Sequence, residues 1–305
     1  LVQNVIPNVV RVHADQATFW DFGSAWYGNY VDQQVVNTMM AQGLKKLTNQ
    51  SSLQAAWSRI MPGYLPGQKI AVKINLNNAS KDDIDLSIDA LPQTAIALVK
   101  TLCEDYGVAQ QDIMIYDALR PMPGRFYTPV AAAFPLVGLY DNGGGYAPQR
   151  AGFTHMDSSL KLTFTQPNLA AERWLTDLLF QAAYVINMPV LKKHGFLPVT
   201  LGFKNHFGST DKLGTLGTDD DLHTYINPNN PPLYDSAQIP LVDINANPNI
   251  HGKTVLTIGD GLFGSRAVGA APERWATFGG KSPNSLLFSR DVVAVDCVMV
   301  DLLRA

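Results

Sequence analysis

A chain of 305 residues with 46% hydrophobic and 16% charged residues is long and apolar enough to bury a sizeable core. Its formal net charge of −3 excludes a nucleic-acid binder held by bulk electrostatics, which would carry an excess of lysine and arginine. No apolar run reaches the roughly 18 residues that a membrane-spanning helix requires, so we expect no transmembrane segment.

The N-terminal residues 1–65 predict a helical segment. Apolar residues recur at helical spacing over 35–44 and again over 53–60. The sequence MPGYLPG then interrupts the pattern, and KIAVKINL (69–76) has the composition of a buried strand. We therefore expect the segment 1–65 to pack on a domain that begins with this strand.

A strand–helix–strand unit comes next. Pro92 suits a first helical turn, an apolar stripe continues to Tyr106, and Gly107 ends it. DIMIYDA (112–118) predicts a second short strand. Short connections between these elements are typical of a βαβ crossover, which predicts a parallel sheet.

A second helix–strand unit follows the turn-rich middle of the chain. KLTFTQ (161–166) has the pattern of an edge strand. LAAERWLTDLLFQ (169–181) predicts a helix that leads into the strand AYVINMPV (183–190). Residues 209–250 hold many Gly, Asp, Asn and Pro residues with little periodicity, which is typical of a long surface loop or lid.

Regular structure resumes near the C-terminus. KTVLTIGDGLFGS (253–265) and SLLFSRD (285–291) predict strands, and a final helix begins at Asp291, whose carboxylate suits the N-cap position. Together the elements predict a single α/β domain over 1–305, with a mostly parallel sheet, helices on both faces and a long irregular loop insertion.

The sequence GDGLFG (259–264) matches the glycine pattern of a dinucleotide-binding turn. The helix that must follow is not predicted, because 266–285 are rich in Gly and Pro and lack an apolar stripe. Without a helix N-terminus, a pyrophosphate has no array of N–H groups to bind. We therefore expect no dinucleotide cofactor and interpret the pattern as a strand end, with Asp260 reaching into a cleft.

The two cysteines cannot supply the ligands of an iron–sulfur cluster. Cys103 lies on the apolar face of a predicted helix and Cys297 lies in VVAVDCVMV, so we expect buried thiols at both positions. Asn49 and Asn78 begin glycosylation sequons, which matter only if the chain is exported.

Cations are concentrated at and after the carboxyl end of the strand 183–190. Among apolar neighbours, this segment contains Lys192, Lys193, His194, Lys204, Asn205 and His206. An ammonium group binds carboxylates or phosphates as a point charge, and a neutral imidazole can take a proton or a metal. The pattern therefore suits an anionic ligand and proton transfer to it. The residues assigned to proton transfer are Lys193, His194, Lys204 and His206.

Polar residues also mark the end of the first strand. In KINLNN (73–78), Lys73, Asn75 and Asn77 alternate with apolar residues, so they share one side near the carboxyl end of the strand. Ligands of open parallel sheets bind outside the carboxyl ends of the strands. We therefore assign these three residues, together with Asn205, to ligand binding.

Two carboxylates complete the ligand-binding set, Asp260 and Asp296. In the final helix, Asp296 falls at an angle shared with Val292 and Val300, so we expect it to be buried. A buried carboxylate needs a cationic partner, a metal or a proton. A structural ion pair and a role in the binding site both satisfy this requirement.

Metal-assisted chemistry is an alternative to anion binding by lysine. Ligands for a divalent metal could come from His194, His206, His223, Asp117 and Asp260. The sequence has neither HxH nor HExxH spacing, so the pattern does not identify a metal.

The segments KINLNNAS, YDALRP, VINMPVLKKHGFLPVTLGFKNHFG, TIGDGLFG and SLLFSRDVVAVD, in this order, resemble the DUF362 family of bacteria and archaea. The resemblance covers about residues 65–300. The family has no assigned function, so the resemblance implies no mechanism. Relatives of the cysteine-poor type are similar to exported proteins with twin-arginine (Tat) leaders. The resemblance thus implies a periplasmic or extracellular protein, with its export signal absent here or already removed.

Two functions of different class fit these observations. The first is an enzyme or binding protein with a Lys/His-lined cleft for an anionic small molecule or a divalent cation. The second is an exported structural or interaction protein, part of an extracellular assembly, whose lysines pair with its own carboxylates. The residues that distinguish the two, by converging on a cleft or by pairing one-to-one, are Lys73, Lys193, His194 and Lys204.

Overall fold

The computed structural model describes residues 8–305 except 80, 83–84, 170, 196, 198 and 231–232. Within this part of the chain, nine strands form one sheet. They are β1 (Val10–His13), β2 (Lys69–Lys73), β3 (Ile113–Tyr116), β4 (Gly138–Asp141), β5 (Gln149–Arg150), β8 (Ala182–Asn187), β9 (Val190–Lys192), β10 (Thr254–Ser265) and β11 (Ser285–Ser289).

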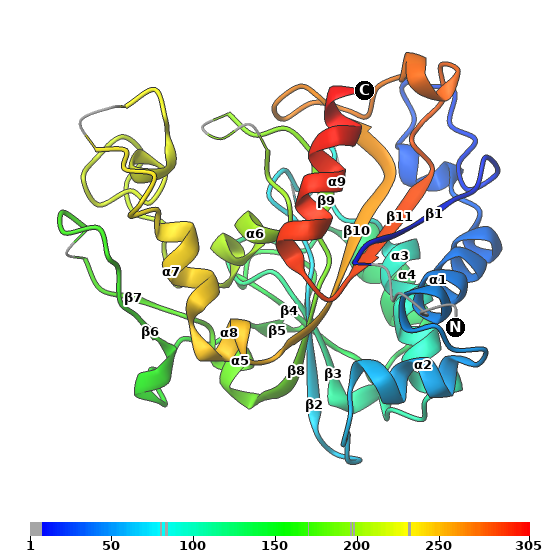
Figure 1. Ribbon diagram of the computed structural model, residues 1–305, viewed down its shortest axis with the longest axis horizontal. Coiled ribbons are helices and arrows are strands. Elements are labelled where there is room, and N and C mark those ends of the chain that lie inside the picture. Colours follow the sequence, from blue (N-terminus) through cyan, green and yellow to red (C-terminus); the bar gives the residue numbers. More distant parts are fainter. Residues whose placement is uncertain are drawn as a thin grey trace, which may run out of the picture.

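The strand order is β1-β11-β10-β8-β2-β3-β4-β5, with β9 paired to β10 (Figure 1). In this order, the strands from β10 to β5 run parallel to one another. At one edge of the sheet, β11 runs antiparallel to both of its neighbours, β10 and β1. The predicted α/β class and the mostly parallel sheet are confirmed.

Helices cover both faces of the sheet, as predicted (Figure 1). One face carries α1 (Gln33–Thr48), α2 (Leu53–Ile60), α3 (Pro92–Lys100) and α4 (Gly124–Ala133). The other carries α5 (Asp177–Gln181), α6 (Gly202–Asn205), α7 (Pro240–Ala246), α8 (Pro248–His251) and α9 (Val292–Arg304). Among the described residues, no helix combines the length and the apolar character needed to cross a membrane.

The register of β2 decides where its last side chain points. Ile70 and Val72 belong to the core beneath α1 and α3, whereas Ala71 belongs to the core on the opposite face. Because side chains alternate along a strand, Lys73 shares the face of Ala71 and is directed toward α6. The backbone pairing of Lys73 with Tyr116 of β3 and Asn187 of β8 places it at the centre of the sheet.

The two predicted helix starts that rest on specific residues are confirmed. Pro92 occupies the first turn of α3, where its missing N–H leaves no backbone hydrogen bond unmade. Asp291 is the N-cap of α9, and its Oδ1 accepts hydrogen bonds from Val293 N (2.8 Å) and Ala294 N (3.2 Å).

The helix predicted over 169–181 was too long. Residue 170 lies outside the described residues, and α5 begins only at Asp177. Arg173 and Trp174 instead form β7, which pairs with β6 (Lys161–Leu162) in a separate two-stranded sheet. The edge strand expected over 161–166 is therefore not part of the main sheet. The guanidinium of Arg173 is buried and bonded to Asp220, a contact from outside the segment that overrides local helix propensity.

The segment 209–250 is less irregular than predicted. It contains the 3₁₀ turn Thr224–Ile226 as well as α7 and nearly all of α8. Tyr225 and Ile226 are fully buried, so this part of the segment contributes to the core rather than forming a solvated loop.

Two further expectations were wrong. The strand β10 continues through the glycine pattern to Ser265, so Asp260 lies within the strand rather than at its end. Cys297 is exposed, because α9 packs through the face of Val295 and Met299 and leaves its other face to solvent. Cys103 is partly buried.

Candidate functional site

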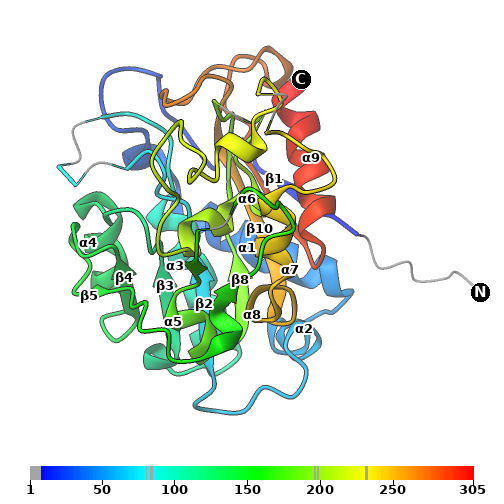
Figure 2. The same cartoon turned by 90° about the vertical axis from the view of Figure 1, so that its left-hand side faces the viewer.

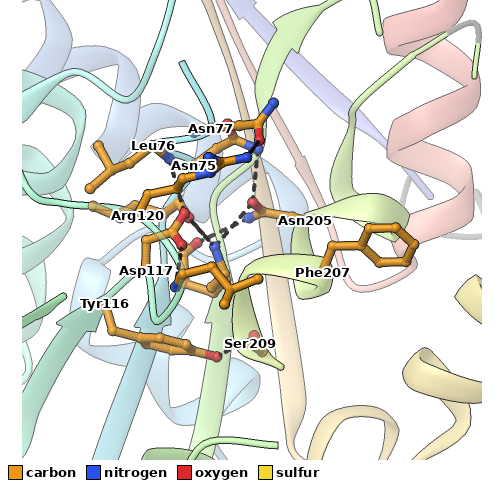
Figure 3. Close-up of polar contacts among 12 residues, drawn as sticks. Asn75, Leu76, Asn77, Tyr116, Asp117, Arg120, Asn205, Phe207 and Ser209 are labelled. Atoms are coloured by element: carbon orange, nitrogen blue, oxygen red, sulfur yellow. Dashed lines mark hydrogen bonds and ion pairs between the residues drawn. The ribbon is translucent and has the colours of Figure 1, made fainter. Parts of the chain in front are cut away.

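A buried ion pair lies at the carboxyl ends of β2 and β3. Lys73 Nζ is 3.1 Å from Asp117 Oδ2, and it also donates to the carbonyl of Ile74 and to Asn205 Oδ1 at 3.4 Å (Figure 3). Asp117 accepts two backbone N–H bonds, from Leu76 (3.1 Å) and Leu119 (3.2 Å). Burial lowers the pKa of Lys73 and the charge of Asp117 opposes this shift. The ammonium and the carboxylate are both satisfied within the protein.

An asparagine network joins this pair to α6, which lies across the carboxyl ends of β2 and β8 (Figures 1 and 2). Asn205 Nδ2 donates to Asn187 Oδ1 at 2.7 Å, and Asn75 Nδ2 donates to Asn205 Oδ1 at 3.1 Å. Arg120 Nη2 donates to Asn77 Oδ1 at 2.9 Å (Figure 3). The structure thus brings together the three asparagines singled out in the sequence and adds Arg120 and Asn187.

At the end of β9, Lys192 rather than Lys193 points inward. Lys192 is 1% exposed and its Nζ donates to the carbonyl of Ile88 at 3.1 Å, whereas Lys193 is exposed. Burial lowers the pKa of Lys192 to about 8, and the charges of Asp89 and Asp117 oppose the shift. Alternation along a strand predicts that only one of two adjacent lysines is buried, but the sequence does not show which.

Lys204 on α6 is buried without a carboxylate partner. Its Nζ lies 3.4 Å from His223 Nε2 and 4.3 Å from the centroid of the Phe207 ring. Among the residues that the structure describes, none places a carboxylate oxygen within 4.0 Å of this ammonium. Burial lowers the pKa of Lys204 to about 7, assisted by Lys192 and Arg120 and opposed by Asp221.

Two histidines lie beside Lys204. The rings of His194 and His223 are stacked, with centroids 5.6 Å apart, and His223 Nδ1 lies 3.1 Å from Asp221 Oδ1. Burial, followed by the charge of Lys204, lowers the pKa of His194 to about 3 and that of His223 to about 4. Both imidazoles are therefore neutral at pH 7. In the sequence, His223 was singled out only as a metal ligand.

A small cavity of about 20 Å³ opens among these groups. The polar side chains that line it are Asn75, Asn77, Asp117, Arg120, Thr200, Lys204 and Asn205. A volume of this size holds one group about as large as a water molecule. Gly208 also lines it, and a Cβ there would come within 2.7 Å of both Lys73 Nζ and Asp117 Oδ1, so a side chain would disrupt the ion pair.

Besides Lys73, Lys193 and His194, which are described above, three further residues assigned to the site from the sequence do not line this cavity. Asp260 faces α3, where its Oδ2 accepts from Thr94 Oγ1 at 3.1 Å, and burial raises its pKa to about 6. Asp296 accepts the backbone N–H groups of Gly202 (2.7 Å) and Phe203 (2.8 Å), so it caps the first turn of α6. Burial also raises the pKa of Asp296 to about 6.

The third residue is His206, which lies on the other side of α6. Its Nδ1 is 3.1 Å from Ser209 Oγ, and burial followed by the charge of Lys73 lowers its pKa to about 3. No group of three or more His, Cys, Asp or Glu side chains is arranged to hold a metal ion within the described part of the chain.

Comparison with known proteins identifies the family of the chain. No curated protein matches the chain. The model of one family, described as a domain of unknown function (DUF362), matches residues 70–301, which include the strands β2, β3 and β8 to β11 and the whole of the candidate site. The chain therefore belongs to the DUF362 family.

Proposed function

We propose that the chain binds a small molecule through a carboxylate or phosphate group at the Lys204 cavity, and that Lys204 exchanges a proton with the ligand. The observation that carries this proposal is the burial of Lys204, which is 7% exposed and has no carboxylate oxygen within 4.0 Å of its ammonium among the described residues. An uncompensated buried charge destabilises the fold, and an anionic ligand would offset that cost.

The neighbouring charges favour an anion. Lys192 and Arg120 both lower the pKa of Lys204, so the potential at its ammonium is positive. Asp117 is the carboxylate that lines the cavity, and its oxygens are engaged by Lys73 and two backbone N–H groups. A divalent cation fits this cavity poorly, because it would be repelled by Lys204 and Arg120.

His223 contacts the lysine that we propose exchanges a proton with the ligand. Because Asp221 accepts a hydrogen bond from Nδ1–H of His223, the Nε2 of that ring carries a lone pair directed at Lys204. A lysine whose pKa is about 7 is present in both protonation states at neutral pH, which suits a general acid or base. His223 can hold Lys204 in position through this contact while Lys204 itself exchanges the proton with the ligand.

The size of the cavity limits what enters it. A volume of about 20 Å³ takes a single oxygen of a carboxylate or phosphate, while the rest of the ligand lies outside. Leu213, in the segment that follows α6, lines the same cavity. Entry of a larger group therefore requires this segment to move.

The proposal is tested by calorimetric titration of the full chain with inorganic phosphate at pH 6.5 and pH 9. We expect saturable binding of one phosphate at pH 6.5 and a loss of at least tenfold in affinity at pH 9, because Lys204 is then neutral. Lys204→Met and Arg120→Gln should each weaken binding at least tenfold at pH 6.5. Lys212→Met is the matched control, since Lys212 is an exposed lysine of the same region.

Three results contradict the proposal: no saturable binding to the wild-type protein, equal affinity in Lys204→Met and Lys212→Met, or affinity that does not change between the two pH values. The last result would mean that phosphate binds to cations other than Lys204. Circular dichroism of each variant confirms that the fold is retained before its affinity is compared.

A further inference from the structure

A second and larger pocket lies on the opposite side of α6 from the Lys204 cavity. Its volume is about 480 Å³, within the range of roughly 300–1,000 Å³ that is typical of small-molecule sites. Phe203 and His206 line this pocket, whereas Lys204 and Asn205 line the Lys204 cavity. The remaining walls come from α7, α8, the start of β10 and the first turn of α9.

The body of the pocket is apolar. Its walls include Phe203, Val242, Ile250, Val292 and Val293. Val242 is 52% exposed and Val293 is 53% exposed, so two aliphatic side chains face solvent across the same pocket. Covering them with an apolar group is favourable by about 25 cal/mol for each Å² removed from water.

The rim of the pocket carries an exposed arginine. Arg290 and His251 line it and are exposed, and neither side chain has a hydrogen-bond or ion-pair partner among the described residues. The one carboxylate of the lining, Asp291, is engaged as the N-cap of α9. The rim therefore offers a guanidinium to an anion, and no lining carboxylate contacts it.

His206 leaves an unused hydrogen-bond donor buried behind the wall of the pocket. Among the described residues, the hydroxyl of buried Tyr116 has one hydrogen-bond partner, Ser209 Oγ at 3.0 Å; both buried hydroxyl protons are used when Tyr116 donates to Ser209 and Ser209 donates to His206 Nδ1, and we infer this direction. This chain of donors leaves the proton of the neutral imidazole on Nε2. That nitrogen is buried and has no partner within the described residues. Unsatisfied buried polar groups are rare in folded proteins and require a reason.

We infer that this pocket binds a small molecule with an apolar body and one anionic group such as a carboxylate. The apolar body lies against Phe203 and the valines, and the anionic group is held by Arg290 at the rim. The inference does not rest on the Lys204 cavity, because the two sites have different linings and lie on opposite sides of α6.

The test compares two probes of nearly equal size, 4-phenylbutyrate and the neutral 4-phenylbutanol, by saturation-transfer NMR and calorimetric titration of the full chain. We expect 4-phenylbutyrate to bind one site at least tenfold more tightly than the alcohol. Arg290→Gln should remove this preference. Ala246→Trp should abolish binding of both probes, because Ala246 is an exposed lining residue whose enlargement fills the pocket.

Arg59→Gln is the matched control, since it removes an exposed arginine from α2 on the other face of the sheet. It should leave both affinities unchanged, and Ala246→Trp should leave phosphate binding at the Lys204 cavity unchanged. The inference is overturned if 4-phenylbutyrate does not saturate, if Ala246→Trp binds it as well as the wild type does, or if the alcohol binds equally. It is also overturned if light scattering shows a dimer that Ala246→Trp dissociates, because a second copy of the chain would then occupy the pocket.

Discussion

Lys73 and Lys204 are both buried lysines near the same small cavity, yet their surroundings differ. Lys73 is matched by Asp117, which directly follows the adjacent strand β3, and both charges have additional hydrogen bonds. Lys204 contacts a neutral imidazole and an aromatic ring instead. The first arrangement ties β2 to β3 and needs nothing from outside, whereas the second leaves a positive charge that a ligand can neutralise. Of the two lysines, only Lys204 therefore has the surroundings expected of a binding residue.

The largest expected effect comes from making the same substitution at both lysines. Lys73→Met leaves Asp117 buried without its ammonium and should lower the free energy of unfolding by about 3 kcal/mol. Lys204→Met removes an uncompensated buried charge and should leave the free energy of unfolding unchanged or raise it. Urea denaturation of the two variants measures the difference.

The double variant Lys73→Met/Asp117→Asn serves as the control for this comparison. Because the single side-chain oxygen of asparagine can still accept one of the two N–H bonds, from Leu76 or Leu119, without a charge, the double variant should recover part of the lost stability. Equal losses of stability in Lys73→Met and Lys204→Met would contradict the difference between a lysine paired with a carboxylate and a lysine without one.

Gly208→Ala tests how closely the chain packs on the ion pair. The added Cβ would lie 2.7 Å from both Lys73 Nζ and Asp117 Oδ1, so one of these groups must move. We expect a loss of about 1–3 kcal/mol in the free energy of unfolding, the usual cost of overpacking. In Gly195→Ala the nearest atom is Val268 Cγ1 at 3.7 Å, so this control should be nearly neutral. Thermal denaturation measures the stability of both variants. Equal stability of Gly208→Ala and Gly195→Ala would contradict the close packing of Gly208 on the ion pair.

Asp296→Ala addresses the support of Lys204 rather than Lys204 itself. The carboxylate accepts the first two free N–H groups of α6, so its loss should cost about 1 kcal/mol of stability. We also expect phosphate affinity to fall by a smaller factor than in Lys204→Met, because α6 carries Lys204 and loses its anchor to α9. Unchanged phosphate affinity in Asp296→Ala would mean that α6 keeps its position without this cap.

The last expected effect is the pH dependence that Lys204 contributes. Its pKa is lowered in the folded protein to about 7, so between pH 7 and pH 10 the unfolded chain binds more protons than the folded one. Stability due to this group therefore rises with pH across that interval, and the cost of burying the charged form is fully present below pH 7. The free energy of unfolding of the wild type, minus that of Lys204→Met, should become more favourable between pH 6.5 and pH 9. A difference independent of pH would place the pKa of Lys204 near its ordinary value.

The amino-acid pattern determined the parts of this protein that depend on neighbouring residues. The apolar stripe from Pro92 and the flanking strands predicted the βαβ unit, because helix and strand periods are local properties. The alternation in 73–78 predicted that Lys73, Asn75 and Asn77 lie on one side near the end of a strand. The rule that parallel strands end at one edge then predicted that they meet Asn205, which the structure shows.

The tertiary structure decided which polar groups are partners. Lys192 rather than Lys193 is buried because the pairing of β9 with β10 sets its register. Asp260 lies under α3, away from the lysines, because β10 continues past the glycines. His223 comes from the segment 209–250, whose irregular composition gave no indication that it packs against α6. Contacts between residues distant in sequence depend on register and on the path of the chain, and no local period encodes either.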